Sequence, residues 1–258
     1  MRTENKEFYH IAQNNDWVDI SKFWSWPTQE ILEDVKNIPD KYWSKPFDGG
    51  NKDNQKGYDD YESNRSLPGT EEGSQLIEAR GWRTAMFLNE TGFSKDQILK
   101  FKPVYKDEWE YKDRWNYIKN ERKWTDIAEF SPTLKKFFES AIFPYLHVGY
   151  IFVTALEPGG IVTKHDDIPD GSIPLLGGEK LHAFDMCNVF NLCLNHVDSC
   201  EAVFNNKVMP SYEGCLMWTN TGKKHWVVNM NRETQYKIIF QALFKKEFRK
   251  KVVKELWL

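Results

Sequence analysis

The stretch GYIFVTALEPGGIVTKHDD (residues 149–167) decides the fold of this chain. Its runs GYIFVTAL and IVTK are rich in β-branched and aromatic residues, which favour strands, and the turn formers EPGG separate them. We therefore expect two strands joined by a tight turn. Further short runs follow, each bounded by turn-forming residues and without helical patterns between them: NVFNLCLN, EAVFNNKVM, GCLMWTN, HWVVNM and KIIFQALF. This pattern predicts a mainly β chain whose core is an antiparallel sandwich or barrel of the jelly-roll or cupin type, with flanking helices.

The first half of the chain has a different composition and hydrophobic pattern. Residues 1–130 mix short helical patterns with polar loops and are rich in tryptophan, so we expect a helical and loop region that wraps the core. Within it, residues 48–75 contain a single aliphatic side chain and many turn formers, which predicts a mobile loop or lid. The β core is expected at 131–244 and a C-terminal helix at 245–258.

Charge and composition exclude several classes of partner. The 35 Lys and Arg residues against 38 Asp and Glu give a net charge of -3, which offers no excess positive charge for a nucleic acid duplex. The most apolar run, 141–156, is shorter than the roughly 20 residues of a membrane span and contains a proline and a histidine. The first residues lack the apolar segment of a secretory signal. We therefore expect a cytoplasmic protein that binds neither membrane nor nucleic acid.

Candidate metal ligands gather at the ends of two predicted strands. His165 and Asp167 are two residues apart, so their side chains share one face of a strand, and His225 opens the later strand HWVVNM. Two imidazoles and one carboxylate on one face suit Fe(II) and leave positions for a co-substrate and dioxygen. His196 and Asp198 have the same spacing, but they lie in the turn-like stretch NHVDSC and too close in sequence to His225 for the chain to cross the barrel and return.

Four motifs in a fixed order resemble a known family. They are LEPGGxxxxHxD (156–167), PxxEGCLMW (210–218), HWVVN (225–229) and a basic residue, Lys237, at the start of the last strand. In this order they resemble the 2-oxoglutarate- and Fe(II)-dependent oxygenases, and within them the aspartyl/asparaginyl β-hydroxylase-like branch, which includes hydroxylases of free amino acids. The likeness covers about residues 131–244, with a weaker echo at 81–88.

The resemblance implies a double-stranded β-helix in which His165, Asp167 and His225 hold Fe(II). It also implies that 2-oxoglutarate chelates the metal and that its distal carboxylate meets Lys237. Arg232, in the turn MNRETQ, is the alternative partner for that carboxylate. Because the branch tends to carry Arg or His on the strand occupied here by 188–191, Asn191 is the candidate contact for the near carboxylate, with a purely structural role as the alternative.

The implied activity is a dioxygenase that couples oxidative decarboxylation of 2-oxoglutarate to hydroxylation of an unactivated C–H bond. The substrate would be a small molecule such as a free amino acid, or a protein Asp or Asn side chain. The presence of Asp167 argues against a halogenase, in which that carboxylate is missing. A non-catalytic cupin-like metal- or ligand-binding module is the alternative and would need no cation at Lys237. A zinc hydrolase would want a general base beside the metal, and no Glu adjoins the three ligands.

Overall fold

The protein is described by a computed structural model that covers residues 14–43, 79–89, 92, 94, 122–165, 172–174, 180–182 and 188–257. The expected lid at 48–75 lies outside these residues. The strands are β1 (Trp17–Asp19), β2 (Ala79–Asn89), β3 (Lys123–Trp124), β4 (Leu146–His165), β5 (Ser172–Pro174), β6 (Lys180–His182), β7 (Asn188–Cys193), β8 (Cys200–Phe204), β9 (Lys207–Val208), β10 (Leu216–Thr219), β11 (His225–Asn229) and β12 (Gln235–Phe244). The helices are η1 (Ser21–Phe23), α2 (Thr28–Lys36), η2 (Asp40–Tyr42), η4 (Asp126–Phe130), α5 (Pro132–Phe137), the π-helical η5 (Phe138–Ile142) and α6 (Lys246–Trp257).

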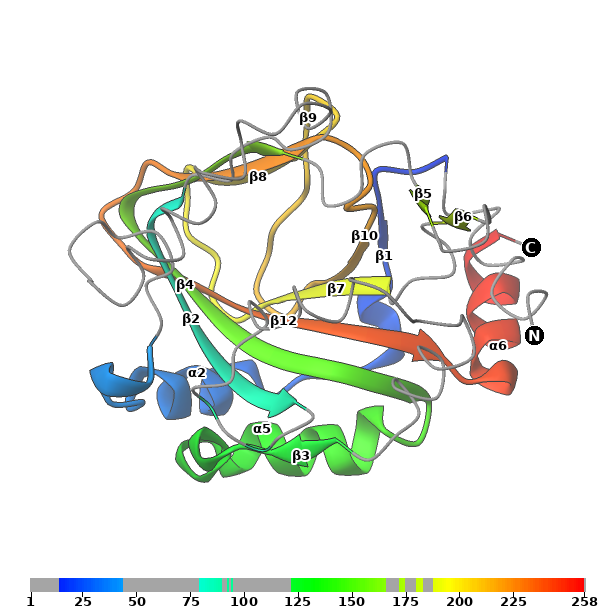
Figure 1. The fold of residues 1–258 in the computed structure, drawn as a ribbon, viewed down its shortest axis with the longest axis horizontal. Coiled ribbons are helices and arrows are strands. Elements are labelled where there is room, and N and C mark those ends of the chain that lie inside the picture. The colour runs from blue at the N-terminus through cyan, green and yellow to red at the C-terminus, as the bar shows by residue number, and fades with distance from the viewer. Residues whose placement is uncertain are drawn as a thin grey trace.

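One antiparallel sheet curls into two layers that face each other (Figure 1). Its strand order is β1-β10-β7-β12-β4-β11-β8-β9, and β2 pairs with β4 outside this path. The first part of β4 pairs with β12 and its last residues pair with β11, so β4 belongs to both layers. The predicted mainly β fold with a jelly-roll-like, double-stranded β-helix core is confirmed.

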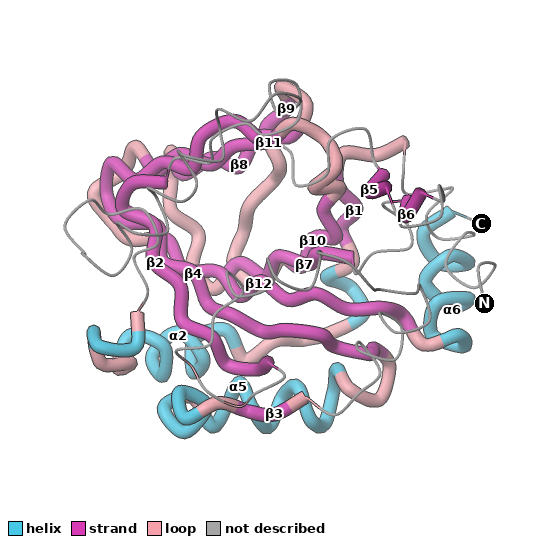
Figure 2. Tube along the Cα trace, viewed as in Figure 1, coloured by secondary structure: helices cyan, strands magenta, loops and turns pink. Residues whose placement is uncertain are grey.

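The helices cover the outer face of the larger layer, as the tube view shows (Figure 2). Alternate residues of β12 point to that face, where Ile238, Phe240 and Ala242 are fully buried with Leu134 and Phe138 of the helical segment. Strand side chains alternate between the two faces, so the other residues of β12 point into the space between the layers. The apolar cluster of Met86, Tyr150, Phe152 and Ile239 lies on that inner side.

The turn predicted at 157–160 is wrong in one respect: β4 runs through it as one strand of 20 residues. Gly159 has a φ of +69°, and Gly160 lies so close to Gly81 of β2 that a Cβ on Gly81 would be 3.1 Å from the Gly160 Cα. The chain therefore bends at EPGG without reversing, because the run after it pairs with β11 and not with the run before it.

The region expected to wrap the core also contributes strands to it. β2 pairs with β4 along most of its length, and β1 pairs with β10 at the end of the sheet. Residues 1–130 therefore contribute β1, β2 and the short β3 to the sheet in addition to helices.

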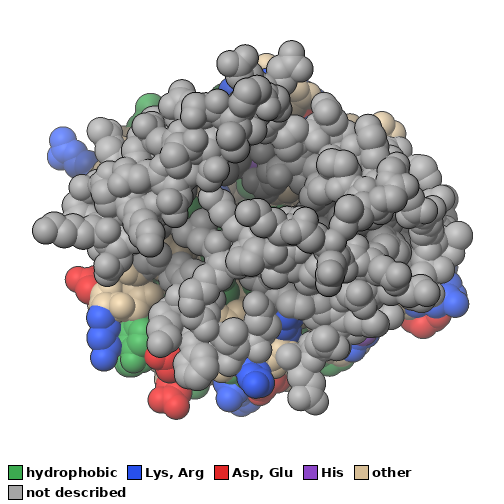
Figure 3. Space-filling view, in the orientation of Figure 1, with side chains coloured by type: hydrophobic (Ala, Val, Ile, Leu, Met, Phe, Trp, Pro, Cys, Tyr) green, Lys and Arg blue, Asp and Glu red, His purple; other side chains and the backbone are tan. Residues whose placement is uncertain are grey.

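Charged side chains of both signs lie on the described surface. Acidic and basic side chains alternate along the edge of the molecule over α2 and α5 (Figure 3). Within the part of the chain that the structure describes, no helix has the length and apolar character needed to cross a membrane.

Candidate active site

His225 opens β11 and faces the space between the two layers. It is the cross-strand partner of Phe204 on β8, and the two rings stack with centroids 4.9 Å apart and planes 8° apart. Its Nδ1 lies 2.8 Å from the carbonyl oxygen of Lys223. Only 8% of His225 is exposed, so the ring is held in one orientation at the start of its strand.

The backbone places His165 directly opposite His225. The two residues are Cα partners where the end of β4 meets the start of β11. Directly opposed residues are the closest side-chain neighbours that an antiparallel pair offers. The side chain of His165 and all of Asp167 lie outside the described residues. Among the side chains that are described, no group of three or more His, Cys, Asp and Glu is arranged to hold a metal.

His196 and Asp198, the competing pair, lie on the connection between β7 and β8. Their side chains are 46% and 88% exposed, and His196 Nε2 is 3.2 Å from Asp198 Oδ1. The pair is therefore a solvent-exposed contact between two neighbours in sequence, away from the strand pair that joins His165 and His225.

Lys237 lies on the inner face of β12 and is only 8% exposed. Its register partners are Thr154 on β4 and Cys193 on β7, and Thr154 is in turn the partner of Thr84 on β2. Directly opposed residues of an antiparallel sheet share a face, so this row presents one ammonium, two hydroxyls and a thiol to the interior. Thr84 and Thr154 are both buried.

An apolar cluster connects Lys237 with His225. It contains Cys193, the partner of Lys237, and Phe204, the partner of His225, together with Met209 and other buried side chains. The buried cation and the buried imidazole therefore face the same interior.

One further thiol, that of Cys215, adjoins this row. The type II turn from Tyr212 to Cys215 has Gly214 at a φ of +77°, and the Gly214 amide donates to the Cys193 carbonyl oxygen while the Cys193 amide donates to the Cys215 carbonyl oxygen. This glycine bulge puts Cys215 beside Cys193. The hydrogen bond from Cys215 lowers the pKa of the Cys193 thiol more than burial raises it, and the Lys237 charge and the Ser211 hydroxyl lower it further. The pKa of Cys215 is raised, because it keeps the shared proton.

The other two predicted co-substrate contacts have different surroundings. Asn191 is half-buried on β7, opposite Ile239 and Met217, and its Nδ2 donates to Thr219 Oγ1 at 2.9 Å. It therefore faces the interior. Arg232 is exposed in the turn between β11 and β12. The structure thus groups Asn191 with Lys237 and leaves Arg232 at the surface.

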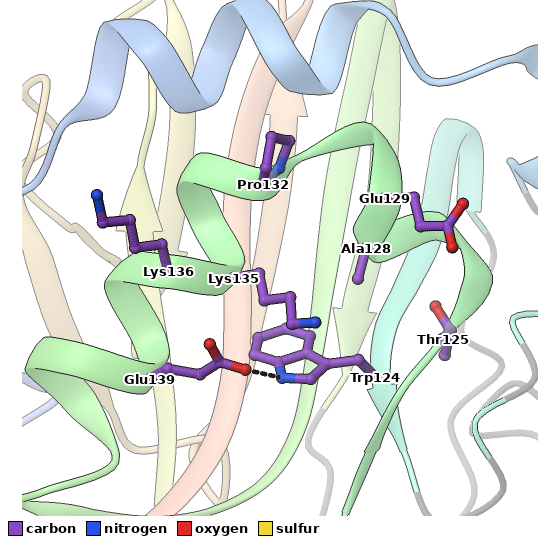
Figure 4. A pocket seen from close by; sticks show the side chains of 8 residues that line it. All are labelled: Trp124, Thr125, Ala128, Glu129, Pro132, Lys135, Lys136 and Glu139. Carbon is purple, nitrogen blue, oxygen red and sulfur yellow. Dashed lines mark hydrogen bonds between the residues drawn. The ribbon is translucent and has the colours of Figure 1, made fainter.

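A cavity of about 390 Å³ lies elsewhere, between β3, η4 and α5. Figure 4 shows the indole of Trp124, one of the lining residues, directed toward Glu139, and its Nε1 donates to Glu139 Oε1 at 2.9 Å. This cavity is on the helix-covered side of the sheet, since α5 packs through Leu134 on the outer face. It is separate from the interior that contains His225 and Lys237.

The sequence motifs do not reveal Thr84, Thr154 and Cys193, which the strand register places in one row with Lys237. A signal for Thr154 exists, because it is the polar residue that shares a face with Tyr150 and Phe152 in the strand GYIFVTAL. Thr84 and Cys193 become recognisable only through their register with β4 and β12.

Comparisons with known proteins concern the fold. A scan against protein-family models gave no match, and a search of curated proteins found no relative. Among solved structures, the chain is similar to a prolyl hydroxylase from Trichoplax adhaerens in complex with a hypoxia-inducible-factor peptide fragment, at 14% identity and a TM-score of 0.40, over 96% of this chain and 91% of that chain.

Two more solved structures have similar scores. A 2OG-Fe(II) oxygenase family oxidoreductase from Burkholderia pseudomallei matches at 7% identity and a TM-score of 0.38, over 82% of this chain and 89% of that chain. The collagen prolyl hydroxylase of Paramecium Bursaria Chlorella virus-1 matches at 9% identity and a TM-score of 0.38, over 90% of this chain and 98% of that chain. Such low values do not establish a shared family. None of the three is described as an aspartyl or asparaginyl β-hydroxylase.

Proposed function

We propose that this chain is a 2-oxoglutarate- and Fe(II)-dependent dioxygenase that hydroxylates an unactivated C–H bond. The proposed substrate is a small molecule such as a free amino acid, or an Asp or Asn side chain of a peptide. The finer choice of substrate follows the motif resemblance to the aspartyl/asparaginyl β-hydroxylase-like branch, within which Asp167 fits the hydroxylases of free amino acids better than the peptide-modifying members.

The observation that carries the proposal is the buried ammonium of Lys237. Lysine is almost never fully buried unless an anion pairs with it, because desolvating a charge is costly. Among the described residues, no Asp or Glu carboxylate forms an ion pair with Lys237, and the acidic group that adjoins it is the Cys193 thiol, which becomes neutral again when a carboxylate takes its place beside Lys237. A cation in this position, with the buried hydroxyl of Thr154 beside it, suits the distal carboxylate of a dicarboxylic co-substrate.

The donor set fits Fe(II). A carbonyl oxygen accepts but cannot donate, so the contact with Lys223 puts the proton of His225 on Nδ1 and directs Nε2 to a metal. His165, opposite it in register, and Asp167 would complete two imidazoles and one carboxylate, the ligand type of non-haem Fe(II) oxygenases. When bound, the metal supplies the activation of dioxygen.

The chain's own contribution is to position the reactants and exclude water. Lys237 would hold the distal carboxylate of the co-substrate, and Asn191 on the same inner face would contact its near carboxylate, while His225 would hold the metal in the same interior. The apolar side chains of Met86, Phe152 and Ile239 line the neighbouring part of the inner face and keep it dry.

The proposal is tested by measuring succinate release from 2-oxoglutarate with Fe(II) across a panel of free amino acids and Asp- or Asn-containing peptides. We expect at least one member of the panel to raise succinate release above the background and to gain the mass of one oxygen atom. A non-catalytic module would bind the metal but release no succinate with any member, and this outcome would contradict the proposal.

A pH dependence of co-substrate binding follows from the lowered pKa of Cys193. Above that pKa the free protein carries a thiolate next to Lys237, and a carboxylate arriving there favours the neutral thiol, so binding takes up a proton. The affinity for 2-oxoglutarate should therefore fall as the pH rises above the lowered pKa of Cys193, by up to about tenfold per pH unit. This fall should begin at a pH below the ordinary thiol pKa of about 8.5. Calorimetric titration of 2-oxoglutarate at several pH values measures the slope.

Two serine variants separate this effect from other titrations. Cys193→Ser should flatten the pH dependence. Cys200→Ser should leave it unchanged, because burial raises the pKa of Cys200 to about 11 and keeps that thiol neutral. An identical slope in Cys193→Ser and the parent protein would show that the thiolate does not compete for Lys237.

A further inference from the structure

Asp16, the residue before β1, is a buried carboxylate with two lysine partners. Its side chain is 5% exposed, and Lys207 Nζ and Lys223 Nζ lie 2.9 Å from Oδ2 and Oδ1 respectively. Burial raises the pKa of Asp16, but the hydrogen bonds from both lysines lower it more, so the pKa is below its ordinary value. Asp16 is therefore ionised at neutral pH, with each of its oxygens bound to a different segment of the chain.

These two segments are the ones that hold the ring of His225. Lys207 on β9 is the register partner of Phe204, which is the register partner of His225 and stacks on its ring. Lys223 precedes β11 and supplies the carbonyl oxygen that lies 2.8 Å from His225 Nδ1. A single carboxylate thus connects the stacking side and the hydrogen-bonding side of the same imidazole.

The backbone of Asp16 holds the second segment as well. The Asn220 amide donates to the Asp16 carbonyl oxygen at 3.1 Å, and the Lys223 amide donates to the Asn220 carbonyl oxygen at 3.0 Å. The turn between β10 and β11 is therefore fixed to Asp16 at both of its ends. The position of this turn determines the direction of the Lys223 carbonyl.

We infer that Asp16 is a positioning residue for His225: by binding Lys207 and Lys223 together, it holds the Lys223 carbonyl oxygen against Nδ1 and presents Nε2 to a divalent metal. The inference rests on the proposed role of His225 as a metal ligand. Groups that orient a metal-binding histidine through its second nitrogen typically change metal affinity by about 10- to 100-fold when they are removed.

The test is a titration of Co(II), as a visible-absorbing substitute for Fe(II), into the full chain and its Asp16→Asn variant. Because Asp16 acts through Lys223 and does not itself contact the ring, we expect the dissociation constant for Co(II) to rise by about tenfold, the lower end of this range, with a changed absorption spectrum of the bound ion. Asp16→Glu, which keeps the charge for both lysines, should recover most of the affinity. The matched control is Asp198→Asn, which makes the same change in the exposed pair with His196 and should leave the Co(II) affinity unchanged.

A purely structural role for Asp16 predicts a different result. Asp16→Asn would then lower the melting temperature, while the folded variant would bind Co(II) within threefold of the parent protein, and this would overturn the inference. If Asp16→Asn does not fold, Lys223→Gln removes only one half-buried partner and should still weaken Co(II) binding, whereas unchanged affinity would contradict the inference.

A measurement on the unaltered protein gives an independent decision. NMR spectra of the metal-free protein, made with ¹⁵N-labelled histidine, should show the ring of His225 protonated on Nδ1. Protonation on Nε2 would overturn the inference. Failure of the proposed function gives a different result. If His225→Ala keeps the Co(II) affinity of the parent protein, the proposed metal site itself is wrong. If His225→Ala loses Co(II) affinity and Asp16→Asn does not, only the role of Asp16 is wrong.

Discussion

Replacing His165, Asp167 or His225 with Ala is expected to abolish metal-dependent succinate release. Each replacement removes one of three ligands, and the remaining two cannot hold Fe(II) in the geometry that oxygenases of this ligand type use. Metal content after reconstitution and the rate of succinate release measure the effect. For His225→Ala the loss also removes the ring that stacks on Phe204, so circular dichroism should accompany the assay to establish that the variant is folded.

His196→Ala is the control for this prediction. It replaces a histidine of the same H-x-D spacing, but its ring is exposed and contacts its own neighbour Asp198. Iron binding and turnover should stay close to those of the parent protein. Loss of iron binding in His196→Ala together with its retention in His165→Ala would reverse the assignment of the ligands.

Much of the β core could be predicted because its strands carry local signals. The run EAVFNNKVM forms the hairpin of β8 and β9, and Asn205 and Asn206 at its centre have φ values of 50° and 62°, which the tight turn requires and asparagine tolerates. The strand KIIFQALF alternates as expected, with Ile238 and Phe240 in the outer core and Lys237 on the inner side.

The bend in β4 and the strands β1 and β2 could not be predicted in the same way. The residues EPGG suit a reversal as well as a bend, and only the distant partners of the two flanking runs decide between them. β1 has three residues, too few for a periodic signal, and its pairing with β10 joins segments about 200 positions apart. Long-range pairing of this kind is a property of the folded sheet and not of a sequence window.

The same distinction holds for the candidate site. His225 and Lys237 have motif positions that a single sequence reveals. The contact of Asp16 with Lys207 and Lys223 has no such signal. The two lysines lie 191 and 207 positions away in sequence, and nothing in their sequence surroundings distinguishes them from other lysines. Sequence patterns thus predict candidate ligands, whereas the groups that orient them emerge only when the sheet brings distant turns together.

Lys237→Ala is expected to weaken 2-oxoglutarate binding strongly. Removing one partner of a desolvated charge pair costs on the order of 2–5 kcal/mol, which corresponds to a loss of roughly 30- to several-thousand-fold in affinity. The buried position of Lys237 favours the upper part of this range, because little solvent is present to screen the carboxylate that loses its partner. Titration of 2-oxoglutarate into the Mn(II)-loaded protein measures the change.

Three comparisons decide whether Lys237 has this role. Lys237→Arg should retain part of the affinity, since guanidinium also pairs with carboxylate but has a different reach. Arg232→Ala should leave 2-oxoglutarate binding unchanged, because that side chain is exposed in the turn between β11 and β12. Mn(II) affinity should survive both changes at Lys237, which is not a proposed ligand. If Lys237→Ala changes the affinity for 2-oxoglutarate by less than threefold while Arg232→Ala reduces it, the distal carboxylate binds near the turn and not on the inner face of β12.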